Sequence, residues 1–210
     1  CNVLSYMDNV KFTALAGAAI TSGMLCAGRV VNIVHYLLQT SVLRGEVVEF
    51  GCYTGKTAAL MSFVSAKPVW LYDSFQGLPD RTSADAGAEP YFLKGSLACS
   101  VDEVMAYFMS HDLLQPRVCA GWFNEIRVDD LPELIRFAHI DGDFFESIRD
   151  SLEHVYPRMV RGSVCIIDDY SWGGLPGVKQ AADDFLRDKR EKISVMITHG
   201  NSHHGVFVKA

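Results

Sequence analysis

The feature that most constrains the fold is a strand pattern that ends in a glycine turn and is followed by a helix and a second strand. Residues 46–50 are rich in β-forming side chains and end at Gly51. Apolar residues then recur at helical spacing through residues 58–64, and a second strand pattern at residues 69–72 ends on Asp73. This order predicts a βαβ unit with two parallel strands.

The same alternation continues along the rest of the chain. Further strands are predicted at residues 117–120, 136–140, 163–167, 193–198 and 205–209, and further helices over residues 30–38, 101–114, 148–156 and 178–186. This pattern predicts an α/β fold with one doubly wound, mainly parallel, seven-stranded sheet and an antiparallel C-terminal strand. Residues 76–98 contain three glycines and two prolines, which predicts an irregular loop that could act as a lid.

Length and composition favour one domain over residues 1–210. Nineteen basic against twenty-five acidic residues give a net charge of −6, which argues against a nucleic-acid partner. The six cysteines form no Cys-x-x-Cys pair, so we expect reduced thiols in a cytoplasmic protein. Residues 12–28 are uncharged but too short for a membrane span, and we expect a buried or lid-forming helix within an N-terminal helical segment, residues 1–45.

The turn after the first strand has the pattern acid-x-Gly-x-x-x-Gly, formed by Glu49, Gly51 and Gly55. Glycines let the backbone approach a ligand, and the N-terminus of the next helix attracts a carboxylate or phosphate. Tyr53 stands where the dinucleotide fingerprint has glycine, which favours a ligand with an amino-acid end over a pyrophosphate. Tyr53 itself either shapes the ligand pocket or packs, and a tight turn without a ligand is the alternative.

Asp73 at the end of the second strand occupies the position where an acid accepts hydrogen bonds from a ribose diol. The alternative is that it caps the loop that begins at Ser74. Taken together, the glycine turn and this acid suggest a nucleoside ligand.

Two later strands also end in acids. Residues 136–140 run into Asp141, and residues 163–167 run into Asp168 and Asp169. Adjacent parallel strands lie about 4.8 Å apart, so these carboxylates would repel one another unless a cation joined them. A hard ion such as Mg²⁺ fits such a cluster, whereas zinc is disfavoured because no His or Cys lies at ligand spacing there. Asp143 either joins the cluster or caps the helix that follows.

A metal at this position could bind two neighbouring hydroxyls of a substrate and lower the pKa of one of them. If the nucleoside ligand is S-adenosylmethionine, its methyl group needs only in-line presentation to the resulting alkoxide.

These segments resemble the TylF/macrocin O-methyltransferases, which are S-adenosylmethionine- and Mg²⁺-dependent sugar O-methyltransferases of the Rossmann-like class I fold. The resemblance rests on Asp-Ser-Phe-Gln-Gly-Leu-Pro at residues 73–79, Gly-Trp-Phe at 121–123, Asp-Gly-Asp at 141–143 and Asp-Asp-Tyr at 168–170, and it spans roughly residues 24–209. It implies that Glu49, Gly51 and Gly55 hold the methionine end, Asp73 and Ser74 the ribose, and Gly121, Trp122 and Phe123 the adenine. It also implies that Asp141, Asp168 and Asp169 bind Mg²⁺, with Asp141 as the general base.

Two departures bear on this resemblance. Phe144 stands where more distant catechol-type relatives can carry a lysine, so a lysine base is not expected. Residues 124–129 are longer than the family's usual turn, which puts the adenine edge in doubt.

The leading hypothesis is an enzyme that methylates a hydroxyl of a sugar or other vicinal diol, on an antibiotic-type glycoside. A non-catalytic nucleoside-binding module and an NAD-dependent oxidoreductase are the alternatives. We expect a small-molecule partner, no nucleic acid and no membrane, and a homo-oligomer is possible. His199, His203 and His204 are expected in a solvated turn.

Overall fold

The computed structural model describes residues 6–22, 25–200 and 202–210. Seven strands form one sheet in the order β3-β2-β1-β4-β5-β7-β6. The strands are β1 (Glu46–Phe50), β2 (Trp70–Asp73), β3 (Arg117–Ala120), β4 (Ile135–Ile140), β5 (Met159–Ile167), β6 (Ser194–His199) and β7 (Ser202–Val208). Strands β1 to β5 pair in parallel, and β7 is antiparallel to both β5 and β6. The predicted α/β fold is confirmed.

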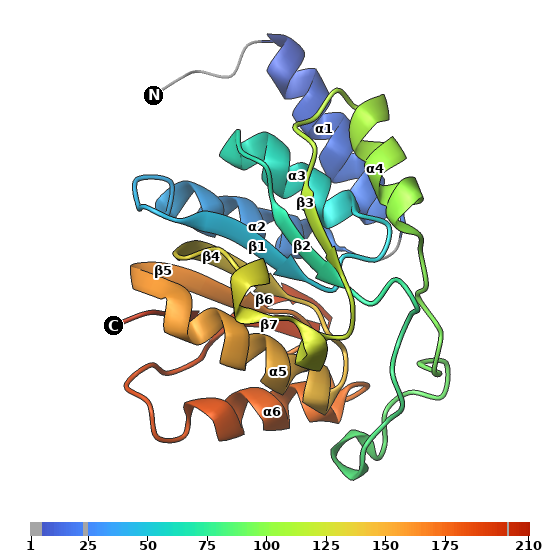
Figure 1. Cartoon of the computed structure of the whole chain (residues 1–210), viewed down its shortest axis with the longest axis vertical. Helices are drawn as coiled ribbons and strands as arrows, with labels where there is room; N and C mark the ends of the chain where they lie inside the picture. Colours follow the sequence, from blue (N-terminus) through green and yellow to red (C-terminus); the bar gives the residue numbers. More distant parts are fainter. Residues whose placement is uncertain (1–5, 23–24, 201) are drawn as a thin grey trace.

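Helices cover both faces of this sheet (Figure 1). The α-helices are α1 (Tyr6–Thr21), α2 (Ala27–Gln39), α3 (Lys56–Ser65), α4 (Val101–Ser110), α5 (Phe145–Val155) and α6 (Pro176–Leu186), and the short 3-10 helices are η1 (Ser83–Asp85), η2 (Phe123–Glu125), η3 (Val128–Asp130) and η4 (Tyr156–Arg158). Helices α5 and α6 contact each other on one face, and α1 and α2 contact α3 on the other. In the described residues, no helix is both long and apolar enough to cross a membrane.

The core consists of two apolar layers, one on each face of the sheet. Val48 and Phe50 of β1 belong to the layer under α5 and α6, whereas Val47 belongs to the layer under α1 to α4. The same alternation occurs in β5, where Cys165 and Val164 face opposite layers. Because both faces are covered, the central strands are apolar almost throughout. Polar side chains inside this sheet, described below, are therefore exceptions that need a reason.

The C-terminal hairpin differs from its prediction. The sequence Gly-Asn-Ser-His-His at residues 200–204 was expected as a solvated turn, but β7 already begins at Ser202. His204 pairs with Met196 of β6 and is fully buried. The expectation is wrong for His204 because strand pairing on both sides of β7 overrides the local turn propensity. The side chain of His199 lies outside the described residues.

Candidate active site

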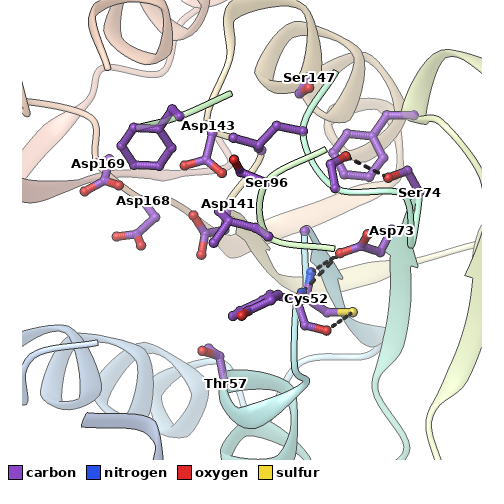
Figure 2. A pocket seen from close by; sticks show the side chains of 18 of the residues that line it. Cys52, Thr57, Asp73, Ser74, Ser96, Asp141, Asp143, Ser147, Asp168 and Asp169 are labelled. Atoms are coloured by element: carbon purple, nitrogen blue, oxygen red, sulfur yellow. Dashed lines mark hydrogen bonds between the residues drawn. The ribbon is translucent and has the colours of Figure 1, made fainter. Parts of the chain in front are cut away.

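The strand order reverses at β1, which pairs with β2 on one side and β4 on the other. At the carboxyl ends of these strands the structure has a cavity of about 660 Å³. Open α/β sheets bind ligands at such a switch point. Nine of the predicted site residues line this cavity: Gly51, Tyr53, Asp73, Ser74, Trp122, Phe123, Asp141, Asp168 and Asp169. Figure 2 shows several of them. Glu49, Gly55 and Gly121 are not among the lining residues.

The glycine turn is required by the packing of β1 against β4. Gly51 has a φ of +85°, and the Asp141 N–H donates to the Phe50 carbonyl at 2.8 Å. A Cβ at Gly51 would lie 2.0 Å from the Asp141 carbonyl oxygen, so no other residue fits there. The turn leads into the N-terminus of α3, where Lys56 and Thr57 line the cavity. This helix end can attract an anionic group.

Glu49 points away from the cavity into the layer under α2. It is 1% exposed, and its Oε1 lies 3.0 Å from Nδ1 of His139, its partner on β4. Burial raises the pKa of Glu49, and the hydrogen bond from His139 opposes that shift. The side chain is therefore part of a buried pair, and its predicted contact with a methionine end stays a prediction.

Asp73 holds the glycine turn against the end of β2. Its Oδ2 accepts from the N–H groups of Cys52 at 2.8 Å and Tyr53 at 3.1 Å, and its Oδ1 accepts from the N–H of Phe75 at 2.8 Å (Figure 2). The loop-capping alternative is thus present in the structure. Ser74 has a similar role, since its Oγ accepts from the N–H of Gln76. Because a carboxylate has further acceptor capacity, Asp73 can also accept from a ligand that enters the cavity.

An aromatic wall follows β3. Phe123 packs edge-on against Phe50, with ring centroids 5.3 Å apart, and its carbonyl oxygen lies 2.8 Å from Nε2 of His154. The segment that is longer than in the family forms η2 and η3, and its residues Asn124 and Glu125 line the cavity. This wall is flat and apolar, with polar groups at its edge.

Four carboxylates gather on one side of the cavity (Figure 2). Asp141, Asp143 and Asp169 each place an oxygen within 4.8 Å of the others. The structure thus groups Asp143 with two predicted metal ligands, Asp141 and Asp169. The third predicted ligand, Asp168, lies instead within 4.8 Å of His139 and His204. Asp143 does not cap α5, because the N–H of Phe145 donates instead to Oδ1 of Asp85 at 2.8 Å.

Arg29 of α2 reaches into this group, and nothing in the sequence pattern indicated it. Its Nη1 lies 2.7 Å from Oδ2 of Asp168, and its Nη2 contacts Oδ1 of Asp169 and Oγ of Ser202. Burial would raise the pKa of Asp168, but Arg29 and His204 hold it below its usual value. One guanidinium against four carboxylates leaves three formal negative charges.

The remaining charge fits a hard divalent cation. Burial and the neighbouring carboxylates raise the pKa of both Asp141 and Asp143, so the ionised forms are disfavoured without a further positive charge. Carboxylate oxygens at this spacing are ligands that Mg²⁺ accepts, with its other positions free for water or substrate. The donor set therefore fits the ion that the family resemblance implies.

The loop of residues 76–98 (Figure 1, green) supplies part of the wall of the cavity. Its Tyr91 and Phe92 line the cavity together with Trp172, and the Phe92 and Trp172 rings are 5.7 Å apart. Arg81 holds the loop together by donating to the carbonyls of Phe92 and Ala88. The position agrees with the predicted lid, and its movement stays a prediction.

Comparison with known protein families shows to which family this chain belongs. The model of the macrocin-O-methyltransferase (TylF) family matches residues 18–208. The chain belongs to this family. Among curated proteins, the TylF-family chain is 33% identical over 153 residues to demethyldecarbamoylnovobiocin O-methyltransferase of Streptomyces niveus, covering 67% of this chain and 58% of that one.

A second relative acts, by its name, on a rhamnosyl group. It is 8-demethyl-8-(2,3-dimethoxy-alpha-L-rhamnosyl)-tetracenomycin-C 4'-O-methyltransferase of Streptomyces olivaceus, 33% identical over 139 residues, 60% of this chain and 53% of the relative. This TylF-family chain therefore spans less than two thirds of the length of both proteins. Among solved structures, the O-methyltransferase NovP matches with a TM-score of 0.80 at 24% identity, over 97% of this chain and 98% of NovP. The fold is thus that of a class I O-methyltransferase.

Proposed function

We propose that this protein transfers a methyl group from S-adenosylmethionine to a hydroxyl of a sugar in an antibiotic-type glycoside, with Mg²⁺ bound at the acid cluster. The observation that carries the proposal is the convergence of Asp141, Asp143 and Asp169 at the switch-point cavity, directly beside the glycine turn. Membership of the TylF family and the rhamnosyl substrate in the name of one relative support the acceptor class.

The part of the cavity beside β1 and β2 suits the methyl donor. The N-terminus of α3 would bind the methionine carboxylate, Asp73 the ribose hydroxyls, and Trp122 and Phe123 the adenine face. Glu49, Gly55 and Gly121 would act by fixing the backbone around this ligand. Bound S-adenosylmethionine supplies an activated methyl group, and the residues named here set the direction in which it points.

The acids would act on the acceptor hydroxyl. Asp141 and Asp169 would hold the ion with Asp143 or Asp168 as the third carboxylate, and a bound Mg²⁺ would favour the ionised form of that hydroxyl. Asp141 would also accept the proton of that hydroxyl, which is the role that the family resemblance implies for it.

The aromatic lid side chains suit a sugar ring. Tyr91, Phe92 and Trp172 offer apolar faces in the same cavity as the acids, and the C–H face of a deoxysugar can pack against them while its hydroxyls point to Asp141. We also place the protein in the cytoplasm, since the cysteines of the described residues are all free thiols.

A binding and turnover experiment tests this function. Calorimetry on the full chain should detect S-adenosylmethionine but not NAD, and deoxysugar glycosides should gain one methyl group by mass spectrometry with Mg²⁺ and not with a chelator. The variant D141N should retain S-adenosylmethionine binding and lose turnover. Binding of NAD without S-adenosylmethionine would support an oxidoreductase, and donor binding without methylation of any glycoside would support a non-catalytic nucleoside-binding module. Either result contradicts the proposal.

A further inference from the structure

A second group of potential metal ligands lies behind the acid cluster, inside the layer under α2. It consists of His139 on β4, Asp168 after β5 and His204 on β7, which are 0%, 2% and 0% exposed. One ligand atom of each residue lies within 4.8 Å of the other two. The two histidines do not line the cavity, whereas Asp168 does, so this group shares one carboxylate with the acid cluster and lies behind it.

Three polar atoms at this place lack a hydrogen-bond partner in the part of the chain that the structure describes. They are Nε2 of His139, Nε2 of His204 and Oδ1 of Asp168. The last two lie 3.0 Å apart as a buried His–Asp pair that falls short of an aligned hydrogen bond. Buried polar atoms are nearly always satisfied, so the unpartnered Nε2 of His139 beside this poorly aligned pair points to a bound species that all three atoms share.

The other nitrogen of His139 is already engaged. Its Nδ1 lies 3.0 Å from Oε1 of Glu49, and a carboxylate can only accept. The proton of His139 therefore lies on Nδ1, and Nε2 carries a lone pair. A metal-binding histidine is typically oriented by such a carboxylate on its other nitrogen.

His204 also has a polar partner on its Nδ1, which is the side-chain amide of Asn32. Nδ1 of His204 lies 3.5 Å from Nδ2 of Asn32 on α2. Because a half-turn of the amide presents its oxygen instead, Asn32 can accept a hydrogen bond from Nδ1–H, and the lone pair of His204 then lies on Nε2. Both histidines thus have the outer partner that a ligating imidazole needs.

We propose that His139, Asp168 and His204 form a binding site for a first-row divalent ion of the zinc type. Two imidazoles and one carboxylate favour such an ion over Mg²⁺, which prefers oxygen ligands alone. Metal bonds of about 2.1 Å place neighbouring ligand atoms about 3 to 3.5 Å apart, and the 3.0 Å pair agrees with this spacing. The sequence pattern disfavours zinc only at the acid cluster and does not reveal this group, because His204 arrives on an antiparallel strand far along the chain.

The site would join three strands. It links β4 and β5 to β7 through Oδ1 of Asp168, while Oδ2 of the same carboxylate faces Arg29 and the cavity. Its burial leaves no room for a substrate, so its role is to fix the C-terminal hairpin and the orientation of Asp168. This inference does not depend on the proposed methyl transfer.

The test is metal binding by the chelator-stripped full chain in saturating Mg²⁺, which occupies the acid cluster. Wild-type protein should bind one equivalent of Zn²⁺ in competition with a chromogenic chelator. H204Q should lose this binding, E49Q should weaken it by about 10- to 100-fold, and D143N, which alters only the acid cluster, should leave it unchanged. Equal Zn²⁺ affinity in wild type and H204Q overturns the proposal, as does loss of Zn²⁺ binding in D143N alone.

H204Q removes a buried side chain and can therefore unfold the protein. A second measurement uses wild-type protein alone. Crystals of wild-type protein grown with Zn²⁺ should show an anomalous scattering peak between the two Nε2 atoms and Oδ1 of Asp168. A water molecule at that point, with zinc confined to the surface or the acid cluster, overturns the proposal.

Discussion

Arg29 and Asp168 are 139 residues apart in the chain, yet Nη1 of Arg29 lies 2.7 Å from Oδ2 of Asp168. The two side chains are 11% and 2% exposed, so this is a buried ion pair. It joins the N-terminal helix α2 to the strand end that carries two of the acids. The positive charge that partly balances the acid cluster thus comes from the N-terminal segment and not from the motifs at the strand ends.

Removal of Arg29 should make the fold dependent on a divalent ion. We expect R29M to lower the free energy of unfolding by about 3–5 kcal/mol without metal, because buried carboxylates are left without their partner. Mg²⁺ should restore most of that loss. Urea unfolding with and without Mg²⁺ measures both effects. R127M is the matched control, since the Arg127–Asp130 pair is exposed to solvent and should contribute little to stability. A metal-independent loss in R29M would show that the guanidinium acts only by packing.

The acid cluster should give the metal-free protein an unusual pH dependence. The pKa values of Asp141 and Asp143 are raised in the folded state, so above the unfolded value of about 3.9 the folded protein binds more protons than the unfolded chain. Their contribution to stability therefore falls as pH rises through the folded pKa values. The lowered pKa of Asp168 acts oppositely, with a contribution that is lost as pH falls below about 3.9.

Unfolding experiments from about pH 4, close to the ordinary pKa of aspartate, up to neutral pH test this. D143N should be more stable than wild type at neutral pH without metal, and the difference should vanish near pH 4. The same variant should bind Mg²⁺ more weakly if Asp143 is the third ligand. A D143N protein that is less stable than wild type at neutral pH would contradict a raised pKa of Asp143 in the folded protein.

The strand ends were predictable because they combine two local signals. Residues 46–50 and the strand that ends at Ile140 have β-forming side chains. Each strand is followed by glycine or aspartate at its carboxyl end, which is where ligands bind in this fold class. Parallel pairing then brings Asp141 beside Asp168 and Asp169 without further information. The mainly parallel sheet and the strand-end acids follow from such patterns, whereas the order of the strands comes from the structure.

Residues that reach the site from distant elements could not be found in this way. Arg29 lies on an amphipathic helix, whose periodicity does not say which strand end the polar face meets. Asp85 lies in an irregular loop, and His204 follows residues typical of a turn. Asp143 was ambiguous because a cap and a cluster member have the same local sequence. In each case tertiary packing decides the role.

Asp85 should attach the lid loop to the core. It is 1% exposed, caps α5 through the N–H of Phe145 and also accepts from the N–H of Thr82. D85A should lower the free energy of unfolding by about 1–2 kcal/mol and speed proteolysis within residues 76–98. D80A, which removes only the exposed pair with Lys94, should change neither clearly. Unchanged proteolysis in D85A would mean that Arg81 alone holds the loop.

Trp172 should contribute to binding of the acceptor and not of the methyl donor. Its ring lines the cavity beside Phe92, and its backbone N–H donates to the Asp169 carbonyl at 3.0 Å, next to the acid cluster. Loss of a stacked aromatic face costs about 1 kcal/mol, so W172A should raise the KM for a glycoside acceptor about 5- to 10-fold at unchanged kcat. W172F should restore most of the affinity, because it keeps an aromatic face. Steady-state kinetics with a glycoside acceptor that carries the free hydroxyl, together with calorimetry of S-adenosylmethionine, separates the two ligands. If W172A weakens donor binding and leaves the acceptor KM unchanged, the aromatic lid side chains belong to the donor site and the proposed arrangement of the two ligands is wrong.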